Sequence, residues 1–218
     1  SIKGHQDEYI NIKYKDGDSE RFIIQCKNND NLLIFTTLGK FYSIKCSKIN
    51  SGRGYGDPVG VFIDRSDNEE IIFFDVFESN KDYLISNSSG KGFFVNSDSL
   101  SSSTKSGKKV MNLKSNNKAI CCSRKYGDSI AVFSGEKKSL KLLIFKHKEI
   151  PVLAKGTGVI LQKFKSGKTF ITTCLDSQIG LINQLSGKVI LNNKDLLNWI
   201  GKRAQSGKIQ PRNILSKL

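Results

Sequence analysis

The sequence of 218 residues has no long hydrophobic run and very little proline. A membrane-spanning helix needs roughly 18 or more consecutive apolar residues, and none occurs, so no membrane span is predicted. The chain starts at Ser1 without a signal peptide, and we expect it to be a domain cut from a longer protein. With 38% hydrophobic and 25% charged residues, it is typical of a globular chain rather than a disordered one.

Residue types that serve metal binding and catalysis are scarce and scattered. The five cysteines are an odd number without CxxC spacing, and the adjacent Cys121 and Cys122 cannot easily both reach one ion. The histidines, His5 and His147, lie far from them in sequence. No carboxylate pair, Ser-His-Asp set or P-loop is evident. We therefore expect no metal, no cofactor and no catalysis in this segment, and buried free thiols in a reducing compartment.

Acidic residues are scarce in the second half of the chain. Residues 1–104 hold 12 Lys+Arg and 15 Asp+Glu, whereas residues 105–218 hold 23 Lys+Arg and 5 Asp+Glu. The net charge of +15 therefore comes entirely from the second half and indicates a polyanionic partner. Most of these cations are lysines, which suit phosphate contact without base reading. The alternative is a solvated surface in a lysine-rich proteome, but a uniform bias would not leave the first half acidic.

Short segments rich in Ile, Val, Phe, Tyr and Thr dominate the sequence, and turn residues separate them. Segments such as 59–63 and 71–76 are predicted to be strands, and 19 glycines suit many tight turns. One segment differs: residues 192–203 begin with Asn and Asp, carry apolar residues at helical spacing and end in cations. This pattern predicts a short helix.

A unit of about 50 residues recurs four times. Each copy runs from an apolar stretch through a glycine turn into a second strand and then a basic glycine loop. The copies begin at 32–37, 83–86, 130–133 and 170–174. The loop glycines, Gly52, Gly107, Gly156 and Gly207, are 55, 49 and 51 residues apart. With a further strand after each loop, a unit has the content of a propeller blade, and an N-terminal hairpin would bring the count to about five blades.

The basic loops are candidate phosphate-binding elements. Glycine lets backbone N–H groups approach a phosphate closely, and the loop cations supply charge. The loops provide Arg53, Lys105, Lys108, Lys109, Lys155, Arg203 and Lys208, and a second run provides Lys163, Lys165 and Lys168. Residues 137, 138 and 141 form a further lysine run. For any single lysine, a solvated position without contact is equally compatible with the sequence. No recognition helix or zinc finger points to base reading.

Several of these loops, with their flanking residues, resemble the C-terminal domain of the bacterial topoisomerase IV A subunit. The similar segments are 52–59 (GRGYGDPV), 105–112 (KSGKKVMN), 156–164 (GTGVILQKF) and 195–208 (DLLNWIGKRAQSGK). The resemblance extends over nearly the whole chain from about Tyr9. A single GxG element is a weak signal, but the ordered recurrence with matching flanks is specific.

The resemblance implies an all-β fold, a propeller-like β-pinwheel of about five four-stranded blades with a short C-terminal helix, as one domain over residues 1–218. It implies a cytoplasmic, nucleoid-associated domain whose basic face binds and bends duplex DNA without sequence specificity. The domain would present the DNA to the catalytic core for decatenation or relaxation. The partners would be duplex DNA, the B subunit, and the rest of the A subunit. These protein parts, with ATP and magnesium, would carry out strand cleavage and passage.

One motif of the related gyrase A domain is missing. The sequence lacks the glutamine-arginine-arginine-glycine-glycine-lysine-glycine box of gyrase A, which favours the topoisomerase IV interpretation. A gyrase A wrapping domain and a propeller that binds an acidic protein remain the alternatives.

Overall fold

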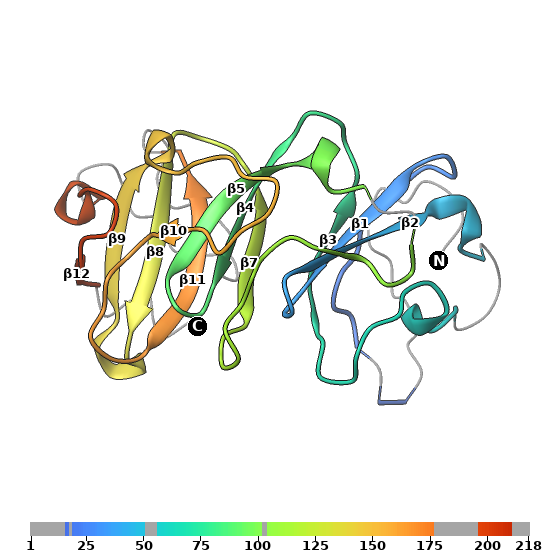
Figure 1. Ribbon diagram of the computed structural model, residues 1–218, viewed down its shortest axis with the longest axis horizontal. Helices are drawn as coiled ribbons and strands as arrows, with labels where there is room; N and C mark the ends of the chain where they lie inside the picture. Colours follow the sequence, from blue (N-terminus) through green and yellow to red (C-terminus); the bar gives the residue numbers. More distant parts are fainter. Residues whose placement is uncertain (1–15, 18, 51–55, 102–103, 177–195, 211–218) are drawn as a thin grey trace.

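Three antiparallel sheets of four strands each build the part of the protein that the structure describes. The computed structural model describes residues 16–17, 19–50, 56–101, 104–176 and 196–210. Figure 1 shows the three sheets side by side in chain order, with the first sheet at the N-terminal end of the row. The prediction of an all-β fold is confirmed.

Each sheet is built around a hairpin, and the repeated glycines lie at the turns between the two hairpin strands. Gly39 and Gly90 adopt positive φ values of 72° and 77° in the first two turns, a conformation that glycine accepts without a Cβ clash. The hairpins consist of β1 (Asn31–Thr36) with β2 (Lys40–Lys45), β4 (Asp82–Asn87) with β5 (Lys91–Asn96), and β8 (Ser129–Gly135) with β9 (Lys141–Lys146).

A third strand flanks the first strand of each hairpin. These strands are β3 (Ile71–Val76), β7 (Ala119–Arg124) and β11 (Lys168–Leu175). The expectation that residues 170–174 open a fourth unit is wrong, because β11 pairs with β8 and completes the third sheet. The apolar pattern of a third strand is the same as that of a hairpin strand, so the pattern alone does not identify the partner.

The fourth strand of each sheet comes from the following unit. These short strands are β6 (Lys108–Lys109), β10 (Val159–Ile160) and β12 (Lys208–Ile209). β6 follows β5 in sequence but pairs with β2, and β10 follows β9 but pairs with β5. Neighbouring units therefore exchange strands, which is the pinwheel arrangement that the resemblance implies. A total of about five blades stays a prediction, because residues 1–15 and 177–195 lie outside the described part of the chain.

Two expected elements differ from the sequence interpretation. Residues 59–63, expected to be a strand, begin with the 3-10 turn η2 (Val59–Val61). Of the helix expected over 192–203, residues 192–195 lie outside the described part and Leu196 is α-helical. The 3-10 turn η6 (Leu197–Trp199) follows, and the helix does not continue to 203, because Ile200 returns to extended backbone and bridges to Ile144. The other short turns are η1 (Cys46–Lys48), η3 (Ser97–Ser99), η4 (Lys137–Ser139) and η5 (His147–Glu149).

The largest cluster of buried side chains joins all three sheets. It includes Phe35 of the first sheet, Phe93 of the second and Phe145 of the third. The expectation of buried thiols holds for Cys46, Cys122 and Cys174, whereas Cys121 is half-buried and Cys26 is exposed. Within the described ranges no group of three or more His, Cys, Asp and Glu side chains could hold a metal ion. No helix among those residues is long and apolar enough to cross a membrane.

Strand exchange should depend on the glycine that precedes each exchanged strand. Gly158 has φ +74°, and a Cβ there would lie 2.6 Å from the carbonyl oxygen of Gly92. Gly158→Ala should lower the free energy of unfolding by about 1–3 kcal/mol, measured by urea denaturation. Gly156→Ala in the same loop is the matched control, because its Cβ would meet a Leu153 methyl at 3.5 Å and the Gly158 amide nitrogen at 3.8 Å, both ordinary contact distances. Equal losses in the two variants would contradict the role of Gly158.

A buried histidine should make stability depend on pH. His147 donates from Nε2 to the Ser129 carbonyl at 2.6 Å and packs edge-on against Phe94, and burial lowers the pKa of His147 below 6.5. The unfolded chain therefore takes up the proton first, so stability should fall as the pH drops below about 6.5, by at most about 1.4 kcal/mol per pH unit. Urea unfolding between pH 7.5 and 5.5 measures the slope. His147→Gln, which does not titrate, should flatten it; an unchanged slope would assign the effect to other groups.

Candidate nucleic-acid interface

The exchanged strands create a continuous rim along the edge of the molecule where the hairpins turn. A backbone hydrogen bond links each loop to the chain segment that leads into the third strand of the preceding sheet. The amide of Asp64 donates to the Lys105 carbonyl at 2.8 Å, and that of Asn112 to the Gly156 carbonyl at 2.8 Å. The amide of Lys163 donates to the Gln205 carbonyl in the same way at 3.1 Å. We call this edge the rim; it joins elements from all three sheets.

One lysine occupies the same register in each sheet. Lys40, Lys91 and Lys141 are the first residues of β2, β5 and β9, and each faces the second residue of the exchanged strand. The sequence interpretation did not select Lys40 or Lys91 as candidates and included Lys141 only as part of a lysine run. The signal that could have found them is their shared place at the start of the second hairpin strand.

A groove of about 790 Å³ lies on the rim between the second and third sheets. Five of its lining residues are lysines, and Glu136 is the only acidic residue among those that line it. The lysines are Lys91, Lys114, Lys141, Lys163 and Lys165. Side-chain amides and hydroxyls, including those of Asn87 and Ser134, complete the lining. Such a surface can neutralise several phosphates and donate hydrogen bonds to them without distinguishing bases.

The predicted contact residues fall into separate groups along the rim. Lys163 and Lys165 come together in the groove, and Lys168 is exposed at the start of β11 with its Nζ over the Phe170 ring. Lys155 is exposed in the loop before β10, and Lys208 is exposed on β12. Arg53 lies outside the described residues. The structure thus brings two of the predicted residues into one groove and spreads the others over neighbouring loops.

Lysines of the second loop are exposed but held by backbone acceptors. The ammonium group of Lys105 donates to the Val61 carbonyl at 2.8 Å, and that of Lys108 donates to the Ser99 carbonyl at 2.6 Å. Lys109 is exposed opposite Lys40. The two hydrogen bonds orient the side chains of Lys105 and Lys108 while leaving their charge at the surface, where it can act on an anion.

Arg203 stabilises the loop in which it lies. Its side chain is half-buried, and its guanidinium donates to the Ile160 carbonyl at 2.8 Å. Its backbone amide donates to the Glu149 carboxylate at 2.8 Å. Arg203 therefore fastens residues 201–207 onto β10, a role that the basic character of the loop did not predict. Direct contact between Arg203 and DNA stays a prediction.

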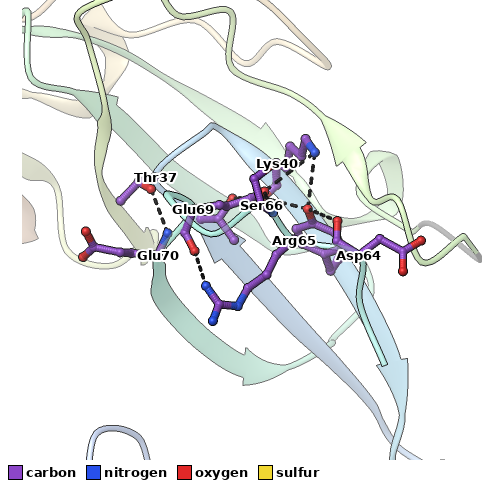
Figure 2. A network of polar contacts seen from close by, with 9 residues as sticks. Thr37, Lys40, Asp64, Arg65, Ser66, Glu69 and Glu70 are labelled. Carbon is purple, nitrogen blue, oxygen red and sulfur yellow. Dashed lines mark hydrogen bonds and ion pairs between the residues drawn. The ribbon is translucent and has the colours of Figure 1, made fainter. Parts of the chain in front are cut away.

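A buried carboxylate distinguishes the first sheet from the other two. Glu69 is fully buried and accepts hydrogen bonds from Thr36 Oγ1 at 2.5 Å and from the Tyr42 hydroxyl at 3.0 Å. Its other oxygen lies 3.7 Å from Lys40 Nζ (Figure 2). Burial and the Glu69 carboxylate raise the pKa of Tyr42, so Tyr42 stays a neutral donor. Lys40 is thus partly neutralised within the fold, whereas Lys91 and Lys141 have no ion pair among the described residues.

Comparison with known proteins identifies relatives over nearly the whole chain, although no protein-family model matches it. The A subunit of DNA topoisomerase 4 from Rickettsia bellii is 38% identical over 213 residues, which cover 97% of this chain and 28% of that protein. The same subunit from Caulobacter vibrioides is 30% identical over 212 residues, which cover 97% of this chain and 27% of that protein. The chain therefore spans less than a third of the length of these relatives.

Solved structures with the same architecture are C-terminal domains. The Escherichia coli ParC C-terminal domain matches with a TM-score of 0.82 at 20% identity, over 97% of this chain and 89% of that one. The gyrase A C-terminal domain matches with a TM-score of 0.60 at 20% identity, over 87% of this chain and 64% of that one. The fold is thus the β-pinwheel found in the C-terminal domains of ParC and gyrase A.

Within that class, the sequence matches identify the particular family. The chain belongs to the family of topoisomerase IV A subunits and aligns with their C-terminal part. The resemblance drawn from the loop motifs is confirmed.

The groove should carry more of the polyanion affinity than lysines away from the rim. Lys163→Glu with Lys165→Glu should weaken binding to a random duplex at least tenfold, because two donors become repulsive charges. Lys45→Glu with Lys48→Glu makes the same change in net charge at exposed positions near the far end of β2. Fluorescence anisotropy at fixed salt measures both. Similar losses would mean that net charge alone drives association.

Proposed function

We propose that this domain binds duplex DNA without sequence specificity and bends it. The observation that carries the proposal is the groove with five lysines on a rim that presents a lysine in the same register of each sheet. Lysines repeated along an edge can contact successive phosphates of a duplex. The described part of the chain offers no recognition helix, so sequence preference would arise only from DNA bendability.

Bending follows from the placement of donors on successive sheets. In a propeller-like fold successive sheets are arranged around a common axis, so their loops follow a curve. A straight duplex would meet such a row of loops at one place, whereas a curved duplex could contact several loops together. Smooth bending of a 20–30 bp site costs on the order of 1–6 kcal/mol, so several lysine contacts must act together to offset it. Lys155 and Lys208, on different loops, are the predicted donors beyond the groove.

The relatives give this activity its context. We infer that the domain is part of a topoisomerase IV enzyme in the cytoplasm, that it associates with the nucleoid, and that it presents a DNA segment to the catalytic core for decatenation or relaxation. Its protein partners would be the B subunit, together with the remainder of the A subunit. Cleavage, ATP and magnesium chemistry would reside in those parts.

An acidic protein partner is the competing interpretation, because lysines also bind carboxylates. Salt dependence alone does not separate the two, since both kinds of association are electrostatic. Competition does: random duplex DNA should displace a labelled duplex at equal phosphate concentration, whereas polyglutamate of equal charge should displace it poorly. More effective displacement by polyglutamate would favour a protein partner.

Duplex length should determine both affinity and bending. Affinity for random duplexes should rise with length until the rim is spanned and then level off, with a log–log salt slope of about −0.9 for each phosphate contact. Energy transfer between dyes at the duplex ends should report bending for the longer duplexes only. A double variant in which Lys155 and Lys208 become Ala should retain binding to short duplexes and reduce the bend of long ones.

Two outcomes would count against this proposal. A salt slope near zero would show that phosphates do not supply the affinity. A long duplex that binds at full affinity without a change in end-to-end distance would leave DNA binding intact but contradict bending.

A further inference from the structure

Three equivalent connectors follow the rim into the third strand of each sheet. They are residues 64–70, 112–118 and 163–168, and they lead into β3, β7 and β11; the last residue of the third connector, Lys168, is also the first residue of β11. Their equivalence rests on repeated backbone hydrogen bonds. The first residue of each connector donates to a loop carbonyl, as described for the rim. The carbonyls of Glu70 and Lys118, the last residues of the first two connectors, accept from the amides of Thr37 and Ser88 in the hairpin turns, at 2.8 and 2.9 Å.

The charge of these connectors changes sign along the rim. The first contains four carboxylates and one arginine, for a net charge of −3. The second contains two lysines and the third contains three lysines, with no acidic residue in either, for net charges of +2 and +3. Asp64, Asp67 and Glu70 are exposed in the first connector, as are all the lysines of the other two. The same structural position therefore repels an anion at the first sheet and attracts it at the third.

Carboxylates of the first connector also engage the nearest lysines. Glu69 lies 3.7 Å from Lys40, the first-sheet member of the repeated lysine position. Glu70 lies 3.7 Å from Lys118 of the second connector, and both of these side chains are 58% exposed. The second pair is weakened by solvent and salt, but it places a negative charge at the boundary between the first and second sheets.

We propose that duplex DNA occupies the rim of the second and third sheets and leaves it at residues 64–70, whose carboxylates limit the length of DNA that the domain holds. This inference rests on the proposed DNA-binding function. A phosphate over the first connector would face like charges, and the nearby ammonium group of Lys40 is already paired with Glu69. The second and third connectors contain no acidic residue, so a phosphate there would face an excess of lysines, with Glu70 beside Lys118 and Glu136 in the groove as the nearby carboxylates. Bound DNA would therefore end at the first sheet, where the carboxylates repel phosphates; we call this the closed end of the rim.

Reversing the exposed acids of the first connector should extend the bound segment. The test variant is Asp67→Lys with Glu70→Lys, which leaves the buried Glu69 in place. The log–log salt slope should steepen by about 0.9 for each new phosphate contact, or about 1.8 for two. The duplex length at which affinity levels off should also increase.

A matched control separates position from net charge. Asp98→Lys with Asp128→Lys makes the same charge change at exposed residues near the strand ends away from the hairpin turns. Circular dichroism and urea unfolding verify that both variants stay folded. A steeper slope and a greater duplex length at the affinity plateau, in the first-connector variant alone, would support the inference. An equal increase of the salt slope in both variants would overturn it, because the change in net charge would then be sufficient to explain the stronger binding.

Two further results distinguish this inference from the proposed function. If the first-connector variant gains nothing while Lys163→Glu with Lys165→Glu still weakens binding, the closed end is refuted and DNA binding stands. If the unmodified domain does not bind duplex DNA at all, the proposed function fails and the inference fails with it.

Discussion

Exchange of a short strand between neighbouring sheets is the constraint on which the rest of the structure depends. Each exchanged strand follows a glycine with φ between 71° and 74°, at Gly107, Gly158 and Gly207. A Cβ at Gly158 would lie 2.6 Å from a backbone carbonyl oxygen of the receiving sheet, and a Cβ at Gly207 would meet the Leu142 carbonyl oxygen still more closely. Glycine is therefore required twice over at these two positions, by the backbone conformation and by the close approach of the two chain segments.

Strand exchange also determines where the charge lies. Because each unit reaches into the preceding sheet, its loop lies at the boundary between two sheets rather than at the end of one. The connectors and hairpin turns meet at the same boundaries, and the groove with Lys91 and Lys163 forms there. A modest lysine content in each unit thus becomes a basic groove between two sheets, because the fold collects lining residues from five separate segments of the chain.

Sequence reasoning predicted the elements better than their partners. Alternating apolar stretches and glycine turns were sufficient to predict an all-β repeat, because both signals are local. The assignment of residues 170–174 to a fourth unit failed, because a strand's hydrophobic pattern does not record which strand it pairs with. Strand exchange itself was implied only by the family resemblance. Lys40 and Lys91 were not selected, because their significance comes from register.

The repeated lysine position has two different roles. In the first sheet the lysine stabilises a buried carboxylate, whereas in the other sheets it lies in an open groove. A buried carboxylate is costly unless several donors satisfy it. Glu69 has such donors in Thr36, Tyr42 and a nearby ammonium group, so Lys40 belongs to the internal network of the first sheet. Its counterpart Lys91 lines an open groove. The three sheets therefore share the same backbone geometry but differ in charge. The connector is acidic at the first sheet and basic at the second and third.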